Sequence, residues 1–394
     1  MSNSPQKFEH NGVEVFYDSP ETILRVMIDS RDLVNIFGLL NEPNYHAVDV
    51  LYIPTEFDAI CFRIFDTIEE MNSQTEFILS VYLANFLFQQ FTILWTYYLT
   101  HNRHLMGTKL WQHACRITWQ WEGSHNMKVH KGTPYFFLGG NQLMQGNLDN
   151  AFLFIHNAME EDIRYSDQII DQLLYKTMPA YLFSSLIADD PRNYLFPYVH
   201  GAKRKIDSFI LDHNVLLSKN FPYSNFDIKF LKNQDLEEIK FFFVYNLFTM
   251  INHDNMDTKE LQKNEFSKLR NLDLIFNLCL IIDETMKKKT NQEYISESIK
   301  QLCSSKLNET DAHGIFAKLD FRNDFENAVK TCLSLNYSYN SRSINKEVLL
   351  LILVWGLRNF GGHKIEAREL FVDNYQNLVK QLLSVLFLTI EYFY

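Results

Sequence analysis

Glycine and proline are scarce in this chain, and their scarcity constrains the fold more than any other feature. Only 13 Gly and 9 Pro occur in 394 residues, so there are few points at which a helix must end. Apolar residues recur at spacings of three and four, the period of a helix that buries one face. The 33 Phe and 20 Tyr provide ample material for large cores. We therefore predict an all-α fold.

Length and a break in the helical periodicity predict two domains. A chain of 394 residues exceeds what one compact core usually holds. Between Pro222 and about Asp235 the sequence PYSNFDIKFLKNQD interrupts the pattern. We place the boundary there, with an N-terminal helical interaction or sensing domain over residues 1–225 and a second domain over 226–394. The segment GVEVFY near the start is a candidate for one strand.

Charge and cysteine usage predict a cytoplasmic protein. The net charge of −11 disfavours nonspecific binding to nucleic acid or anionic lipid. Five scattered cysteines without a CxxC pair fit a reducing compartment, and the N-terminal residues lack the apolar core of a signal peptide. Residues 77–100 are uncharged and nearly apolar all round, but Asn85, Gln89 and Gln90 stand in their middle. We expect a helix over residues 75–99 that lies in the middle of a stack, without membrane contact.

Residues 135–162 predict two helices joined by the short turn QGNLD. Gly139 on the first helix can meet Ala151 on the second, and Ala158 follows one heptad later with Ile155 between them. Small residues at such positions let paired helices approach closely. An ordinary helical hairpin has this pattern, and it also resembles one tetratricopeptide repeat, at Leu138, Gly139, Gly146, Ala151 and Ala158. No second copy follows at the family period.

The stretch LRNFGGH follows an apolar helix predicted over Val348–Leu357. Arg358 and His363 are five residues apart, which on an unbroken helix would separate them by about 140° around the axis. Gly361 and Gly362 change this, because glycine permits the left-handed turn that ends a helix. The chain can then fold the imidazole back toward the guanidinium.

The pattern R-N-x-x-x-H after an apolar helix resembles the signature of the HEPN superfamily of small helical ribonuclease domains. It is matched at Arg358, Asn359 and His363, within a helical region of roughly residues 230–394; the segment from Ser298 to Ser343 departs from the family. The resemblance implies a metal-independent endoribonuclease that cleaves RNA by 2′-hydroxyl attack, needs no cofactor and acts as a homodimer through this domain. It also suggests a toxin or antiviral defence effector, with a protein or small-molecule regulator at the N-terminal domain.

The residue types suit this chemistry. Histidine can transfer protons at neutral pH, and arginine presents a permanently charged fork to phosphate oxygens. Asn359 could orient the phosphate or the imidazole. The Val348–Leu357 helix is apolar on every side, and a final helix from Glu369 carries an apolar stripe that includes Phe371 and Tyr375. We therefore expect a partner chain to bury part of these helices.

Two alternatives remain open. LRNFGGH can be a helix cap in a non-catalytic scaffold that binds protein or RNA. A weaker possibility is a metal-dependent enzyme, since imidazole and thiolate are good zinc ligands. Its candidate ligands are His101, His104, His113, Cys115, His125 and His130. Two basic runs, residues 203–205 and 287–289, are either solvated helix ends or local RNA contacts. A second Arg-Asn pair, Arg192 and Asn193 with His200, is interrupted by Pro197.

Overall fold

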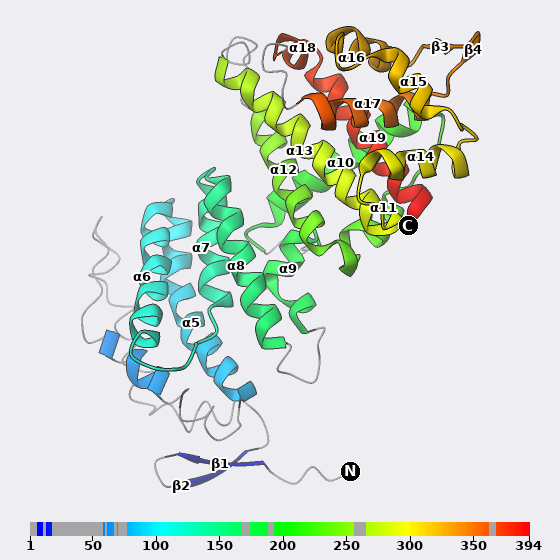
Figure 1. The fold of residues 1–394 in the computed structure, drawn as a ribbon. Coiled ribbons are helices and arrows are strands. Elements are labelled where there is room, and N and C mark those ends of the chain that lie inside the picture. Colours follow the sequence, from blue (N-terminus) through cyan, green and yellow to red (C-terminus); the bar gives the residue numbers. More distant parts are fainter. Residues whose placement is uncertain are drawn as a thin grey trace. The chain divides into compact units, whose positions relative to one another are not determined.

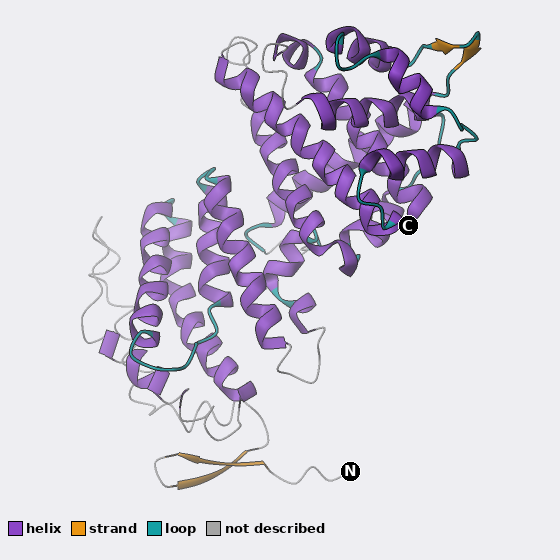
Figure 2. Cartoon of the chain, viewed as in Figure 1, coloured by secondary structure: helices purple, strands orange, loops and turns teal. Residues whose placement is uncertain are grey.

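The computed structural model describes residues 6–10, 13–17, 58–59, 61–66, 69, 77–166, 174–187, 193–255, 265–361 and 368–394. Over these residues nearly all regular structure is helical, and the strands form two short antiparallel hairpins (Figure 1). Figure 2 shows the same predominance of helix in its colouring by secondary structure. The prediction of an all-α fold is confirmed.

The chain divides into two compact units, Met1–Leu182 and Phe183–Tyr394. The elements of the first unit are β1 (Gln6–His10), β2 (Val13–Tyr17), α5 (Phe77–Thr100), α6 (His104–Glu122), α7 (Gly132–Met144), α8 (Leu148–Ser166) and η1 (Leu174–Thr177), and α9 (Pro179–Ser184) crosses the division. Strand β2 covers most of GVEVFY and pairs with β1, so the predicted strand is confirmed.

The second unit is built from helices around the apolar helix α17. Its elements are α10 (Phe196–Leu217), α11 (Tyr223–Phe226), the π-helix η2 (Asp227–Leu231), η3 (Gln234–Leu236), α12 (Glu237–Asn255), α13 (Glu265–Thr290), α14 (Ile295–Lys306), α15 (Ala312–Leu319), α16 (Phe325–Ser334), β3 (Ser338–Tyr339), β4 (Arg342–Ser343), α17 (Lys346–Phe360), α18 (Arg368–Asp373) and α19 (Tyr375–Phe393).

The division between the units lies earlier than the predicted boundary after residue 225. Helix α10, which the sequence pattern assigned to the first domain, packs against α19. The ring of Phe387 on α19 contacts the ring of His213 on α10 and that of Phe221 just after it, at centroid distances of 5.5 and 5.6 Å. Helix α10 therefore belongs to the core of the second unit.

Helix α5 begins two residues after the start of the predicted helix over residues 75–99 and ends one residue beyond it, and its surroundings differ from the prediction. Phe88 and Phe91 are fully buried, whereas Gln89 and Thr96 are exposed. The helix therefore has one face toward solvent, and the expectation of a position inside a stack is wrong because Gln89 and Thr96, seven residues apart, share that face. Within the described residues, no helix is both long and apolar enough to cross a membrane.

The hairpin of α7 and α8 is closely packed, as predicted. A Cβ atom added to Gly139 would lie 2.8 Å from the carbonyl oxygen of Ala151 and 2.8 Å from Cγ1 of Ile155. Only a residue without a side chain permits this approach. In the turn between the helices, Gly146 has φ of +76°, a left-handed conformation that glycine adopts without strain.

Helix α17 is buried within its own chain. Residues 348–354 are all 0% exposed, covered by α13, α14, α15, α16 and α19. The expectation that a partner chain would cover this helix is wrong, because the surrounding helices already do so. The predicted final helix is in fact two, since α18 ends at Asp373 and α19 begins at Tyr375. The stripe residues Phe371 and Tyr375 are buried on either side of that break.

Candidate functional site

Helix α17 carries the Arg-Asn pair of the predicted site in its last turn. The side chain of Asn345 accepts a hydrogen bond from the backbone N–H of Glu347 and caps the start of the helix. The helix ends at Phe360, but Gly361 has φ of −61° and ψ of −40°. The predicted left-handed turn is therefore absent at Gly361, which continues the right-handed backbone. Residues 362–367, and with them His363, lie outside the described residues, so the approach of His363 to Arg358 stays a prediction.

Arg358 is held by helix α13. Its Nε lies 3.1 Å from Oδ2 of Asp283, and its guanidinium carbon lies 5.5 Å from the centroid of the Phe276 ring. Phe276 and Asp283 are seven residues apart on α13, two helical turns along one face. The arginine side chain is 31% exposed and the aspartate side chain only 2%. Arg358 therefore combines a buried anchor with an accessible guanidinium.

Asp283 holds a second cation. Nζ of Lys287, one turn further along α13, lies 3.1 Å from Oδ1 of Asp283 and 3.3 Å from Oε1 of Glu284. Burial raises the pKa of the Asp283 carboxyl above its usual range, and the charges of Lys287 and Arg358 act in the opposite direction. The two cations offset part of the desolvation of this carboxylate.

An aromatic cluster fixes the end of α17 from the other side. The Phe316 ring on α15 stacks on Trp355 at a centroid distance of 3.8 Å and lies 6.2 Å from Phe360. Phe321 occupies the space in which Gly356 would carry a Cβ atom. Asn359 is exposed, about 100° around the helix from Arg358. The segment from Ser298 to Ser343, which has no counterpart in the family pattern, thus positions the helix end that carries the motif.

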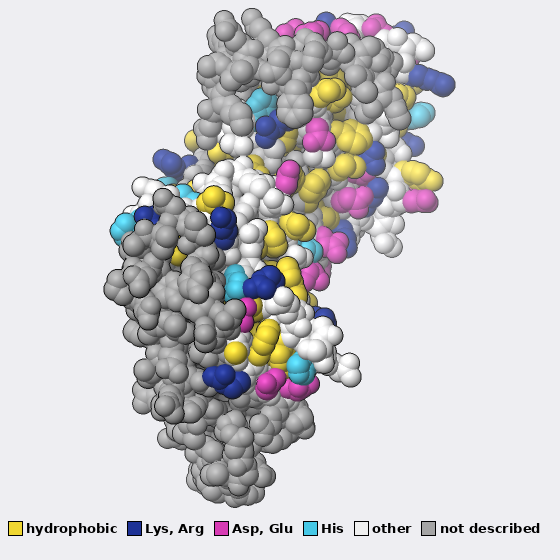
Figure 3. Space-filling model, turned by 90° about the vertical axis from the view of Figure 1, so that its left-hand side faces the viewer, with side chains coloured by type: hydrophobic (Ala, Val, Ile, Leu, Met, Phe, Trp, Pro, Cys, Tyr) yellow, Lys and Arg dark blue, Asp and Glu magenta, His cyan; other side chains and the backbone are white. Residues whose placement is uncertain are grey.

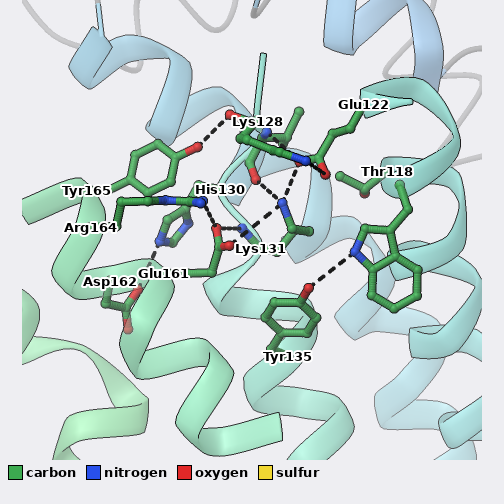
Figure 4. A network of polar contacts seen from close by, with 12 residues as sticks. Thr118, Glu122, Lys128, His130, Lys131, Tyr135, Glu161, Asp162, Arg164 and Tyr165 are labelled. Carbon is green, nitrogen blue, oxygen red and sulfur yellow. Dashed lines mark hydrogen bonds and ion pairs between the residues drawn. The ribbon is translucent and has the colours of Figure 1, made fainter. Parts of the chain in front are cut away.

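A second polar cluster, which the sequence did not reveal, lies in the first unit (Figure 4). Lys131, just before α7, places Nζ 2.5 Å from Oε1 of Glu122 and 2.8 Å from the carbonyl oxygen of Val129. Glu161 on α8 accepts hydrogen bonds from the backbone N–H of Lys131 and from Arg164. Lys131 and Glu122 are buried, and this network ties the loop after α6 to the α7–α8 hairpin.

Of the predicted histidine-rich region, His130 belongs to this cluster. Nε2 of His130 lies 2.9 Å from Oδ1 of Asp162, with both side chains buried. Burial raises the pKa of Asp162, and the contact with His130 opposes that shift. Nε2 of His113 lies 2.7 Å from Oδ1 of Asp58. Across the described residues, no three His, Cys, Asp or Glu side chains are placed to hold one metal ion.

A periodicity signal for Asp162 was present in the sequence. The buried face of α8 contains Ala151, Ile155, Ala158 and Tyr165, and Asp162 falls in the same series, four residues after Ala158. An acidic residue on an apolar helix face predicts a buried partner. Nothing in the sequence identifies that partner as His130, because the two residues are 32 positions apart.

The remaining candidates, apart from Lys287, form no cluster among the described residues. His200 is exposed on α10 with its ring 5.4 Å from that of Phe196, and Arg192 lies outside the described residues. The basic run at residues 203–205 lies on α10, and Lys289 of the second run lies over the Tyr394 ring. On the face drawn in Figure 3, cationic, acidic and apolar side chains are interspersed. All five cysteines are buried thiols, and burial raises the pKa of Cys115 to about 12.

Comparison of the chain with protein families, curated proteins and solved structures found no match. The likeness to the HEPN signature and to a tetratricopeptide repeat therefore rests on the residues quoted above.

Proposed function

We propose that this chain is a metal-independent endoribonuclease of the HEPN type, acting on RNA through Arg358, Asn359 and His363. The observation that carries the proposal is the environment of Arg358. This residue ends a buried helix, is anchored through Nε by a buried carboxylate, and is 31% exposed. Among the described residues, no hydrogen bond or ion pair engages its Nη atoms. Two parallel donors then remain for a phosphate.

In the proposed reaction, the ribose 2′-oxygen attacks the adjacent phosphorus and the bond to the next 5′-oxygen breaks, leaving a 2′,3′-cyclic phosphate. Arg358 stabilises the charge that develops on the phosphorane oxygens. His363 takes the proton of the 2′-hydroxyl or supplies one to the leaving oxygen. The amide of Asn359 donates to a phosphate oxygen.

A single histidine does not serve as base and acid in the same step, so we place a second copy of the motif in a homodimer. Because α17 is already covered, that interface uses other surfaces of the second unit. Mixing His363→Ala chains with wild type should lower activity by more than their share of the mixture. Activity in simple proportion to the wild-type fraction would favour a site completed within one chain.

The second candidate function is a non-catalytic scaffold that binds protein or RNA. The pairing of Arg358 with Asp283 favours it, because an ion pair to a buried carboxylate also has a purely structural purpose. The close α7–α8 hairpin is likewise of a kind that interaction modules use.

Cleavage of single-stranded RNA in excess chelator separates the two functions. We expect the wild type to cleave, to leave cyclic phosphate ends, and to lose this activity in His363→Ala. His200→Ala is the matched control, since His200 is exposed in the same unit beyond the other Arg-Asn pair. Loss of cleavage on chelation, with recovery on adding zinc or magnesium, would contradict a metal-independent site. Equal activity of His363→Ala and wild type would support the scaffold.

A further inference from the structure

Asp283 joins two cations that come from different helices. Its Oδ2 contacts Nε of Arg358 on α17, and its Oδ1 contacts Nζ of Lys287 on α13, both at 3.1 Å. Each carboxylate oxygen therefore fixes one cation, and the width of a carboxylate sets how far apart they are. Asp283 is 2% exposed, so the anchor is rigid and shielded from water.

Both cations keep donors that Asp283 does not use. Lys287 is 23% exposed; of the three N–H donors of its ammonium group, one is hydrogen-bonded to Glu284, and the contact with Asp283 is an ion pair. Glu284 is 52% exposed, and a solvated pair of this kind contributes little. Arg358 and Lys287 together carry two positive charges against the one buried negative charge of Asp283. Glu284, with Oε1 3.3 Å from Nζ of Lys287, adds a second negative charge, so the four side chains sum to zero and the cluster offers exposed donors rather than an excess of charge.

We propose that Lys287 and Arg358 form a two-cation subsite for the phosphodiester backbone of single-stranded RNA, with Asp283 as the residue that positions both. This inference rests on the proposed ribonuclease function and names a binding residue, Lys287, outside the R-N-x-x-x-H motif. Arg358 contacts the scissile phosphate through its fork, and Lys287 contacts a neighbouring phosphate as a point charge. Backbone contacts of this kind set the register of the RNA without reading its sequence.

The test measures binding of a short mixed-sequence oligoribonucleotide whose 2′-O-methyl sugars prevent 2′-hydroxyl attack. Fluorescence anisotropy of the full-length chain gives Kd as a function of salt. Lys287→Met should weaken binding roughly tenfold at low salt and reduce the slope of log K against log salt by about 0.7, the value for one lost contact to a single strand. Lys288→Met is the matched control, because Lys288 is exposed on the next position of α13. It should leave the slope unchanged.

Asp283→Asn tests the positioning role. The variant keeps both cations but loses the charge that fixes them, so we expect unchanged or tighter binding with a lower kcat. Conservative replacement by Asp283→Glu should restore part of kcat. A residue that acts only on stability would instead shift the denaturation midpoint and leave kcat per folded molecule unchanged.

The outcomes separate the two proposals. If cleavage depends on Arg358 but Lys287→Met binds RNA with the wild-type salt slope, the subsite is overturned and the ribonuclease proposal is unaffected. If Lys287→Met lowers the salt slope of RNA binding but the wild type cleaves no RNA, the subsite is supported and the proposed ribonuclease reaction is contradicted. Absence of any binding by the wild type would overturn the subsite as well.

Discussion

The two polar clusters of this protein have similar residue types and opposite accessibility. In the first unit, Lys131 is enclosed by Glu122, Glu161 and the Val129 carbonyl, and its side chain is 4% exposed. In the second unit, Arg358 touches one buried carboxylate and keeps an exposed fraction of 31%. We call the first the closed cluster, comprising Glu122, His130, Lys131, Glu161 and Asp162, and the second the open cluster, comprising Asp283, Lys287 and Arg358.

This difference in accessibility distinguishes charged residues with a structural role from charged residues that are candidates for function. In the closed cluster the ammonium of Lys131 donates to Glu122 and Val129 and lies near Glu161, so little is left for a ligand. In the open cluster a single buried anchor holds two cations whose other donors face outward. Stability should therefore depend strongly on the closed cluster, and activity on the open one.

The largest effect on stability is expected from Lys131→Met. Removing the ammonium leaves the buried Glu122 with the backbone N–H of Val129 and the longer contact to the exposed Lys128, and breaking a buried ion pair costs about 3–5 kcal/mol. Urea denaturation followed by circular dichroism measures the change. Lys128→Met is the control, since Lys128 is 64% exposed and its Nζ is 3.6 Å from Glu122. Equal midpoints for the two variants would show that the closed cluster is not structural.

The next largest effect on stability is expected from protonation of His213, a buried base without a counter-charge. His213 is fully buried, and neither ring nitrogen has a hydrogen-bond partner among the described residues. Burial, with the nearby Lys219 charge, lowers its pKa to about 4, from an ordinary value near 6.5. Between these values the unfolded chain binds a proton that the folded chain excludes. The free energy of unfolding should therefore fall by about 3 kcal/mol as the pH drops from 6.5 to 4.

His213→Phe isolates this contribution, because it places another ring between Phe221 and Phe387 without a titratable group. Denaturation curves collected across that pH range should be flatter for His213→Phe than for wild type. His200→Phe, on the exposed side of the same helix, should keep the wild-type slope. Parallel curves for all three proteins would mean that His213 titrates normally in the folded state.

A smaller loss of folding stability is expected from Gly139→Ala. This variant tests whether the closed cluster needs the close approach of α7 and α8. The added methyl would lie 2.8 Å from the Ala151 carbonyl oxygen, a backbone atom that cannot turn away. Overpacking of this kind costs about 1–3 kcal/mol, partly offset by the better helix propensity of alanine. Gly201→Ala controls for propensity, because nothing lies within 4 Å of its Cβ position. A gain in stability at both positions would refute the close contact.

The smallest effect on stability should come from the open cluster. Arg358→Met leaves Asp283 paired with Lys287, so the carboxylate is not orphaned. Because Arg358 is itself 31% exposed, we expect the free energy of unfolding to fall by less than the roughly 3–5 kcal/mol of an orphaned buried charge. A loss comparable with that of Lys131→Met would make Arg358 a structural residue and erase the contrast between the clusters.

Local sequence pattern predicted what depends on one or two neighbouring helices. The contact of Gly139 with Ala151 follows from periodicity and residue size, and the segment that forms α5 is found to within two residues. Helix α17 does end before the two glycines, but Gly361 does not adopt the left-handed turn from which that end was predicted. These features can be predicted without the rest of the chain, because a helix face or a close helix pair is determined by residues that are near one another in the sequence.

Features that depend on distant packing could not be predicted. Asp283 lies 75 residues from Arg358, and no spacing rule connects them. Helix α10 joins the second unit only because His213 and Phe387 meet, 174 positions apart by their numbering (387 − 213). The α17 helix looked like an interface because its sequence is apolar on every side, but five neighbouring helices cover it within one chain. Sequence pattern shows that a face is apolar and not what covers it.

The most direct test of the central claim, that the open cluster is the functional site, is single-turnover cleavage of RNA by two arginine variants. Arg358→Met should reduce the cleavage rate by about 10²–10³-fold, the usual cost of removing a group that stabilises an oxyanion. Arg322→Met is the matched control, because Arg322 is exposed and precedes Asn323 as Arg358 precedes Asn359. It should cleave at the wild-type rate. Equal rates for both variants and wild type, with all three proteins folded, would contradict the assignment of Arg358 as a catalytic residue.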